Sequence, residues 1–445
     1  MKTILHRNKH MTSFQIIIIG FMSVILIGTF LLMLPFSSKS GVFTPFHEAF
    51  FTSTSAVCVT GLVVKDTASY WSVFGQGIIL ILIQIGGMGV VTVAASVALL
   101  SGKKISLMQR STMQEAIAAP KVGGIVRLTG FIIKTTFLIE LIGALIMMPV
   151  FCKDFGFMGI WMALFHSISA FCNAGFDLMG TEEMPFSSLT IYADRPLISI
   201  TVVLLIIIGG IGFLTWDDIR TNSYHINRYR MQSKIILATT GILIIVPFLF
   251  FYFSEYREEQ IGERILYSLF QSVTPRTAGF NTTDLTAFSG AGKCIVIILM
   301  LIGGSPGSTA GGMKTTTIAV LFSNAVAVFR RKEETHFFGR RLENGVVQNA
   351  STILIMYLTL FISGAVAISV IENLPIGLCL FETASAVGTV GLTLGITPEL
   401  GCVSQVILIV LMFLGRVGGL TLIYATLSQK NRNLSKLPQE KITVG

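Results

Sequence analysis

Long apolar runs constrain this chain more than any other feature of its sequence. Several of them approach or exceed the roughly 20 residues that a helix needs to cross a bilayer. Charged residues make up only 12% of the chain, against roughly 25% in soluble domains. The apolar runs are residues 16–34, 77–100, 131–151, 197–214, 235–253, 294–303, 352–371 and 403–414. The sequence therefore predicts an all-α integral membrane protein. The first run is too long for a cleavable signal peptide, and no small-residue cleavage site follows it.

The charges predict how the chain is oriented. The two tails and the long polar connectors hold 22 of the 32 Lys and Arg residues but only seven of the 23 acidic residues. By the positive-inside rule these segments are cytoplasmic, so we expect both termini inside the cell and a multi-pass protein of the plasma membrane. The net charge of +9 then reflects topology and contact with anionic membrane lipid or an acidic partner, and it needs no nucleic-acid partner. The segments counted as cytoplasmic are 1–15, 101–127, 216–234, 314–345 and 428–445.

Four short segments resemble one another, and each ends in Gly followed by Leu or Phe. Their glycines are Gly61, Gly175, Gly279 and Gly391. Each segment follows an apolar span and a stretch of about a dozen residues, which is too short to cross the bilayer and ends near Ser or Thr. Each is followed by a second span with its own glycine cluster, at residues 86–89, 209–212, 303–307 and 415–419. The short stretches are residues 45–56, 160–171, 263–273 and 375–387.

Each repeat is thus predicted to be a span, a half-helix, a glycine turn and a second span. Four copies give eight spans with pseudo-fourfold symmetry. We place repeat 1 at residues 1–105, repeat 2 at 106–225, repeat 3 at 226–345 with an intramembrane loop at 303–312, and repeat 4 with a cytoplasmic tail at 346–445. Residues 179–196 are predicted to be an insertion on the outer side.

Non-helical backbone at membrane depth is tolerated only where it is buried or lines water. Four glycine turns around one axis can direct backbone carbonyls at a central line, where they replace the hydration shell of a cation. The partly negative carboxyl ends of the half-helices also favour a cation, and glycine allows backbone dihedrals that a side chain would obstruct. A single such turn is usually a packing feature. Four copies in equivalent positions favour a cation pathway.

Two segments carry a resemblance to a known family. Residues 272–281 (SVTPRTAGFN) and 301–312 (LIGGSPGSTAGG) look like signatures of the superfamily of Trk, Ktr and HKT potassium transporters. The likeness runs from about residue 14 to residue 424 and is greatest to the KtrB-type membrane subunits of bacterial Ktr systems. The chain lacks the additional amino-terminal helices of Trk-type subunits.

The resemblance implies that the protein takes up potassium ions as its substrate, forms a homodimer, and selects ions with the backbone carbonyls before the four glycines. In plant relatives, Ser in place of the first glycine accompanies sodium transport, so Gly61 matches the potassium type. Unlike the TVGYG filter of potassium channels, these segments lack a second glycine in register, which predicts a shorter filter. The implied filter residues are Val59, Thr60, Gly61, Asn173, Ala174, Gly175, Thr277, Ala278, Gly279, Thr389, Val390 and Gly391.

The third repeat contains a glycine-rich stretch with a proline, which cannot hold a regular helix. The family places a gating loop here, and the alternative is a helix kink with a structural role only. Arg416 is a charge inside an apolar span, which marks a candidate functional site. It either repels cations in the pore, as the family's pore-facing arginine suggests, or pairs with a carboxylate or with loop carbonyls, and the two roles can coexist. The expected loop residues are Gly304, Ser305, Pro306, Gly307, Ser308, Thr309, Ala310, Gly311 and Gly312.

Three further expectations concern charges and partners. Arg276 and Glu382 flank glycine segments of adjacent repeats and are predicted to pair behind them, while Glu140 is expected to cap or pair locally. The chain contains no soluble nucleotide-binding domain. The resemblance therefore implies a separate cytosolic ring of the KtrA or KtrC kind that binds ATP or ADP, with the basic linkers 220–234 and 328–341 as docking surfaces or simply as a mark of topology. Many family members depend on sodium, but the sequence indicates no sodium site.

Other functional classes fit less well. Secondary transporters with alternating access often show inverted repeats, whereas these four repeats share one orientation. No zinc-ligand spacing, nucleophile elbow or buried cluster of carboxylates and histidines indicates an enzyme or a resident cofactor. Gly307 and Gly312 have the spacing of a phosphate-binding loop, but Lys314 comes one position late and no strand precedes the segment.

Overall fold

The structure is a computed structural model, and it describes residues 12–100, 105–119, 121–332 and 334–419. Apart from one short hairpin, the regular structure in these residues is helical. Four of the helices are long and apolar enough to cross a membrane, or six if two sharply bent helix pairs each count as one span. The expected segments at residues 1–11 and 420–445 lie outside the described residues.

Four long helices open the four predicted repeats. Each matches a predicted first span, because long apolar segments without interior glycine clusters satisfy their backbone hydrogen bonds as continuous helices. α7 and α11 each contain one proline, Pro149 and Pro247, without ending there. The four helices are α1 (Ser13–Leu32), α7 (Ile125–Phe155), α11 (Met231–Phe253) and α15 (Asn344–Glu372).

Four short helices follow, at the positions predicted for the half-helices. Each has 13 or 14 residues, and each ends directly before a glycine segment. Pro45 and Pro375 precede two of them, which fits the preference of proline for helix starts. The short helices are α2 (Phe46–Cys58), α8 (Met158–Phe171), α12 (Ile261–Val273) and α16 (Ile376–Gly388).

A third set of helices ends at or just before the glycine clusters: α4 (Val73–Met88), α9 (Pro196–Gly210), α13 (Gly290–Leu301) and α17 (Cys402–Val417). The apolar runs at residues 77–100 and 197–214 are each divided between two helices. The chain turns by 96° between α4 and α5 (Val90–Leu100), and by 95° between α9 and α10 (Phe213–Asn222). The bends fall at Gly89 (φ 85°, ψ 132°) and Gly212 (φ 92°, ψ 143°), a backbone conformation open to glycine.

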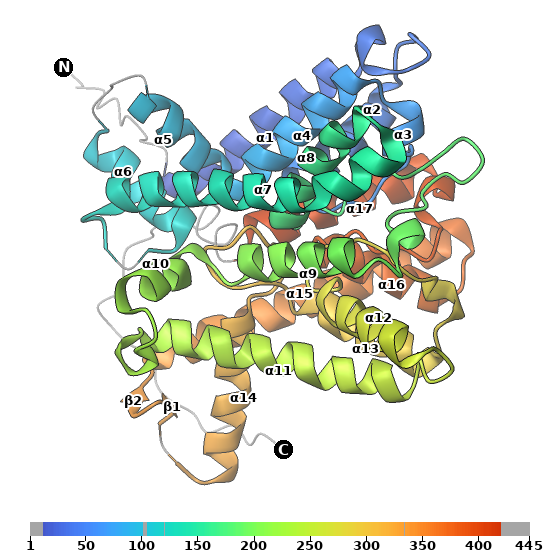
Figure 1. Cartoon of the computed structure of the whole chain (residues 1–445). Coiled ribbons are helices and arrows are strands. Elements are labelled where there is room, and N and C mark those ends of the chain that lie inside the picture. The colour runs from blue at the N-terminus through green and yellow to red at the C-terminus, as the bar shows by residue number, and fades with distance from the viewer. Residues whose placement is uncertain (1–11, 101–104, 120, 333, 420–445) are drawn as a thin grey trace, which may run out of the picture.

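The remaining elements lie between these helices. α3 (Thr67–Tyr70) follows the first glycine segment, and α6 (Leu107–Ile117) connects α5 to α7. After α13 the chain leaves helical structure and resumes it as α14 (Thr315–Phe329). A hairpin of β1 (His336–Phe337) and β2 (Arg340–Arg341) then precedes α15. In Figure 1, α14 and the hairpin project from the main helical body.

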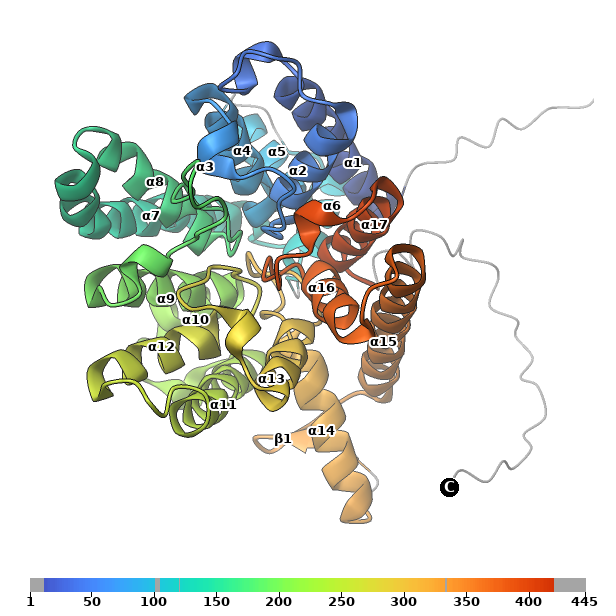
Figure 2. The same cartoon turned by 90° about the vertical axis from the view of Figure 1, so that its right-hand side faces the viewer.

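The helices form a closed cycle of contacts. Within repeats, α2 packs against α4, α8 against α9, and α16 against α17. Between repeats, α4 contacts α8, α9 contacts α12, α13 contacts α16, and α17 returns to α2, while in the third repeat α12 and α13 both pack against α11. Figure 2 shows the corresponding colours, from blue through green and yellow to red, following one another around a common centre. The chain is therefore arranged so that its four glycine segments can meet at that centre.

Candidate functional site

The four glycine segments share one backbone conformation. Each glycine has a positive φ, and so does the residue two positions before it. A positive φ is rare for residues with a side chain, so its fourfold recurrence is a strong mark of a common structure. The paired values are 57° and 91° for Val59 and Gly61, 58° and 68° for Asn173 and Gly175, 72° and 81° for Thr277 and Gly279, and 52° and 97° for Thr389 and Gly391.

The ends of the short helices hold these segments by the same kind of hydrogen bond. The amide of Thr60 donates to the Ser55 carbonyl at 2.8 Å, and the residues before the other three glycines do likewise at 2.8–3.0 Å. The Ser55 hydroxyl accepts from the Gly61 amide at 3.1 Å, while the Ser169 hydroxyl donates to the Phe176 carbonyl at 2.7 Å. The Ser and Thr residues near the helix ends thus fix the turns.

The glycines and carbonyls interlock around a ring. A Cβ atom added to Gly61 would lie 2.5 Å from the carbonyl oxygen of Ala174, and one on Gly175 would lie 2.6 Å from that of Ala278. The same holds, below 3.0 Å, for Gly279 against Val390 and for Gly391 against Thr60. Each glycine therefore lies against the carbonyl that precedes the next glycine, and the fourth closes on the first. All twelve residues predicted as filter residues lie in this ring, where each segment contacts its neighbours.

The ring is not symmetric in its side chains. The Asn173 side-chain amide and the Thr277 hydroxyl are hydrogen-bonded at 3.1 Å, which links the second and third segments. The predicted pairing of Arg276 with Glu382 is wrong. Glu382 instead accepts hydrogen bonds from the hydroxyls of Thr393, at 2.9 Å, and of Thr397, while Nε of the buried Arg276 has no partner among the described residues.

The buried Glu140 was expected to cap or pair locally, but its partner lies in another repeat. Both of its carboxylate oxygens accept from the Gln84 side-chain amide, at 3.0 and 3.2 Å. The backbone carbonyl of Glu140 accepts from the Ser167 hydroxyl at 2.6 Å. Because Gln84 belongs to α4 and Glu140 to α7, the carboxylate joins the first two repeats.

A cavity of about 100 Å³ lies on one side of the ring and is lined by all four glycines together with Asp66 and Asp177. Asp177 lies in the loop between the second glycine segment and α9, and burial raises its pKa to about 7. Asp66 is held by the amide and hydroxyl of Ser69, both at 2.7 Å. An acidic side chain attracts cations only in its ionised form, so the charge that Asp177 places at this opening depends on pH near neutrality.

The glycine-rich segment of the third repeat forms a loop that is anchored to the second repeat. The amides of Ser305 and Thr309 donate to the carbonyls of Gly210 and Gly209, at 3.0 and 3.3 Å. The Thr309 hydroxyl donates to the Phe171 carbonyl at 3.0 Å. Residues 303–314 are therefore outside any helix but well satisfied in their hydrogen bonds, so the segment is a loop and not a kinked helix.

Arg416 connects this loop to the first repeat. Its guanidinium donates to the carbonyl of Thr309 and to those of Gly86 and Gly87, the last at 3.2 Å. The alternative of pairing with loop carbonyls is thus present in the structure. The glycine clusters of repeats 1 and 2 thus also bind the loop and Arg416.

Lys314 is a second positively charged residue at this site, and the sequence indicated no role for it. Its Nζ donates to the carbonyls of Ala310, at 2.8 Å, and Gly311, at 3.3 Å. Lys314 and Arg416 both line a cavity of about 300 Å³, together with loop residues and Glu115 near the end of α6. The signal in the sequence was a lysine directly after a glycine-rich intramembrane stretch.

Comparison with known proteins places these features in context. The model of the TrkH family, described as cation transport proteins, matches residues 3–435. The chain is 39% identical to the potassium/sodium uptake protein NtpJ of Enterococcus hirae, over 98% of each chain. It is 36% identical to the Ktr system potassium uptake protein B of Bacillus subtilis, over 97% of this chain and 96% of the relative. The crystal structure of the potassium transporter TrkH from Vibrio parahaemolyticus has the same fold, with a TM-score of 0.74, 20% identity, and coverage of 96% and 87% of the two chains.

Proposed function

This chain belongs to the TrkH family of cation transport proteins, and we propose that it takes up potassium ions through the ring formed by its four glycine segments. The family consists of membrane potassium uptake transporters and not of enzymes.

The single observation that carries the proposal is the closed ring of contacts between glycines and carbonyls. Four carbonyl groups held around one centre offer a cation the oxygen ligands that it loses with its water. The four short helices end at this ring, so that the partly negative ends of their dipoles surround it. The proposed filter consists of residues 59–61, 173–175, 277–279 and 389–391, and the cavity containing Asp66 and Asp177 is its outer mouth.

The same ring supports a pseudo-fourfold pore with eight spans. Four helices have the length of a span, and α4 with α5 and α9 with α10 supply two more when each bent pair crosses once. α13 with α14 would be the seventh, and α17 would belong to the eighth. Each of the four repeats defined above then contributes one member of the ring. Both termini face the cytoplasm.

We propose that Arg416 and the loop at residues 304–312 form the closed barrier beneath the filter. The guanidinium and the Lys314 ammonium line the cavity on the inner side, where their positive charges oppose a potassium ion. The hydrogen bonds of Arg416 to Thr309 and to the glycine cluster of the first repeat keep this charge and the loop together. Opening would require these bonds to break.

We further propose that the protein acts as a homodimer under the control of a separate cytosolic ring of the KtrA or KtrC kind that binds ATP or ADP. Support comes from the relatives named as the B and D proteins of Ktr systems, which cover nearly the whole chain. The hairpin β1–β2 and the end of α14 project from the helical body, and they fall in one of the two basic linkers. They offer a surface for such a partner.

The decisive experiment measures potassium uptake by cells that lack their own uptake systems and express this chain. Wild-type protein should restore uptake, and Gly61→Ser should lower the preference for potassium over sodium, because the added side chain meets the Ala174 carbonyl in the ring. Comparing uptake with and without external sodium tests sodium dependence. No uptake, or an unchanged ion preference in Gly61→Ser, would reject the proposal.

A further inference from the structure

The loops that follow the four glycine segments must be held in place, because each continues directly from a proposed ligand of the ion. Nine residues before each glycine, the short helix presents one side chain at an equivalent position. These residues are Thr52, His166, Phe270 and Glu382. All four are buried, yet only His166 and Glu382 bond to the loop beyond their own glycine segment.

Glu382 holds the loop of the fourth repeat. Its carboxylate is fully buried and accepts from the hydroxyls of Thr393, at 2.9 Å, and Thr397. Thr393 in turn accepts from the Gly395 amide at 3.0 Å, and it lines the cavity at the outer mouth. A buried carboxylate that accepts several hydrogen bonds is strongly tied to their donors.

His166 does the same for the second repeat. Its Nδ1 bonds to the Met162 carbonyl at 2.7 Å, and its Nε2 lies 3.3 Å from the Leu178 amide nitrogen. Since an amide can only donate, Nε2 accepts, Nδ1 carries the proton, and the ring is neutral. The imidazole also packs against Phe151, with ring centroids 5.3 Å apart. It therefore has one orientation, with its acceptor directed at the loop.

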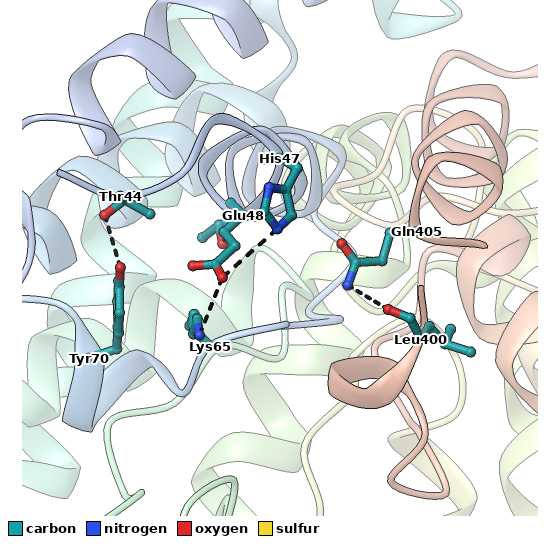
Figure 3. Close-up of polar contacts among 8 residues, drawn as sticks. Thr44, His47, Glu48, Lys65, Tyr70, Leu400 and Gln405 are labelled. Carbon is teal, nitrogen blue, oxygen red and sulfur yellow. Dashed lines mark hydrogen bonds and ion pairs between the residues drawn. The ribbon is translucent and has the colours of Figure 1, made fainter. Parts of the chain in front are cut away.

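The other two repeats use different supports. The Thr52 hydroxyl bonds back to the Glu48 carbonyl of its own helix, at 2.9 Å, and Phe270 is apolar. In the first repeat, Glu48 of α2 forms an ion pair at 3.3 Å with Lys65, which lies in the loop after the glycine segment (Figure 3). The outer insertion at residues 179–196 supplies the other hydrogen bonds to the loops of repeats 1 and 3.

The insertion reaches from the second repeat to both of its neighbours. In the first repeat, Asp66 accepts from the Phe186 amide at 3.0 Å. In the third repeat, the backbone amide of Asn281 donates to the Ser188 hydroxyl at 3.0 Å, and the backbone carbonyl of Asn281 accepts from the Leu189 amide at 2.9 Å. The insertion thus holds the loops of repeats 1 and 3. His166 and Glu382 of the short helices hold the loops of repeats 2 and 4.

We propose that His166 and Glu382 are positioning residues that hold the outer ends of the second and fourth segments at the spacing that favours potassium over sodium. This inference rests on the proposed filter function. The two repeats are not neighbours in the helix cycle but lie across it, so the two residues tie the loops that follow two opposite members of the ring. Sodium is the smaller ion, and discrimination against it requires that facing carbonyls resist moving inward.

The test compares initial rates of potassium and sodium uptake, normalised to the amount of protein in the membrane. Glu382→Leu and His166→Phe remove the acceptors, and each should lower the potassium-to-sodium ratio about tenfold, the effect expected when a buried charged or polar bond is lost. Glu382→Gln and His166→Gln retain an acceptor oxygen and should recover part of the ratio. Thr52→Val is the matched control, because it changes the equivalent position without touching the loop, and it should leave the ratio unchanged.

Thr393→Val removes the hydroxyl that donates to Glu382, with little change in shape. It tests the role of this bond in selectivity even if Glu382→Leu does not reach the membrane. It should lower the ratio, and the double variant with Glu382→Leu should lose less than the two single losses combined, because both single changes remove the bond between Glu382 and Thr393. Wild-type selectivity in Glu382→Leu, Thr393→Val and His166→Phe, or an equal loss in Thr52→Val, would overturn the inference. Failure of the wild-type protein to prefer potassium would instead overturn the proposed function.

Discussion

At the scale of single residues, the ring is built on four glycines, and the buried Glu382 is bonded to two threonines of its own repeat. The four glycines could be found because their conformational role recurs at equivalent positions. The pairing of Arg276 with Glu382 failed because position along a repeat does not give the direction of a side chain. The partners of Glu382 are Thr393 and Thr397, which follow it within its own repeat. The role of Lys314 was missed because one positive charge beside a loop has many ordinary explanations.

Replacing a ring glycine tests the ring directly. Gly279→Ala introduces a Cβ that overlaps the Val390 carbonyl at a φ of 81°, where a left-handed conformation alone costs about 1–2 kcal/mol. We expect potassium uptake to fall at least about tenfold. Gly262→Ala lies in the short helix of the same repeat with open space around it, and it should transport normally. Normal uptake by Gly279→Ala would show that the ring need not be this tight.

Removing the positive charge at the barrier should raise transport. At about 8 Å and an effective dielectric constant of about 20, a unit charge opposes a potassium ion by about 2 kcal/mol. Arg416→Ala should therefore raise resting potassium uptake roughly tenfold or more. Arg127→Ala, which removes an exposed arginine in the first turn of α7, is the control. Uptake at the wild-type rate in Arg416→Ala would argue that the arginine is only a structural tie.

At the scale of helices, hydrophobic length and glycine position predicted where elements lie, and they failed where a helix bends. The short helices appear within a few residues of their predicted bounds, because the following glycine turn leaves the helix no way to continue. The sharp bends after α4 and α9 were missed, since glycine clusters inside apolar runs are also compatible with straight helices. The signal was present in retrospect, because Gly89 and Gly212 occupy the same place in their clusters and share their dihedrals.

The loop between α13 and α14 should act as a barrier in its own right. Deleting residues 305–310 removes the anchor of Thr309 on Phe171 and the bonds to Gly209 and Gly210, so resting potassium uptake should rise severalfold. Thr309→Val removes only the hydroxyl bond and should produce a smaller rise in the same direction. The measurement is potassium uptake at matched amounts of protein in the membrane. If neither variant differs from wild type, the loop does not limit the flow of ions.

At the scale of the whole molecule, the sequence predicted the order of the four repeats but not the contacts that join them. The insertion at residues 179–196 was recognised only as extra length on the outer side. Its bonds to Asp66 and Asn281 could not be foreseen, because they join residues 93–120 positions apart through loop backbone. Long-range contacts of this kind depend on the completed arrangement of repeats.

The orientation of the molecule can be tested with its own thiols. Cys402 begins α17 on the predicted outer side and is exposed. A variant that keeps only this cysteine should react with a membrane-impermeant maleimide in intact cells. Tyr224→Cys in a cysteine-free background places a thiol at a position that is 95% exposed on the predicted inner side, and it should react only after the cells are permeabilised. The reverse pattern would invert the proposed topology.

The closure of the ring has a consequence for how the protein is made. Gly391 lies against the carbonyl of Thr60, and α17 lies against α2, so the first repeat lacks its last neighbour until almost the entire chain has been synthesised. Chains grow at about 5–20 residues per second, which leaves the early repeats in the membrane for many seconds without a complete ring. An unfinished or truncated polypeptide therefore cannot enclose a continuous path, and the cell is protected from ion leakage while the transporter is being assembled.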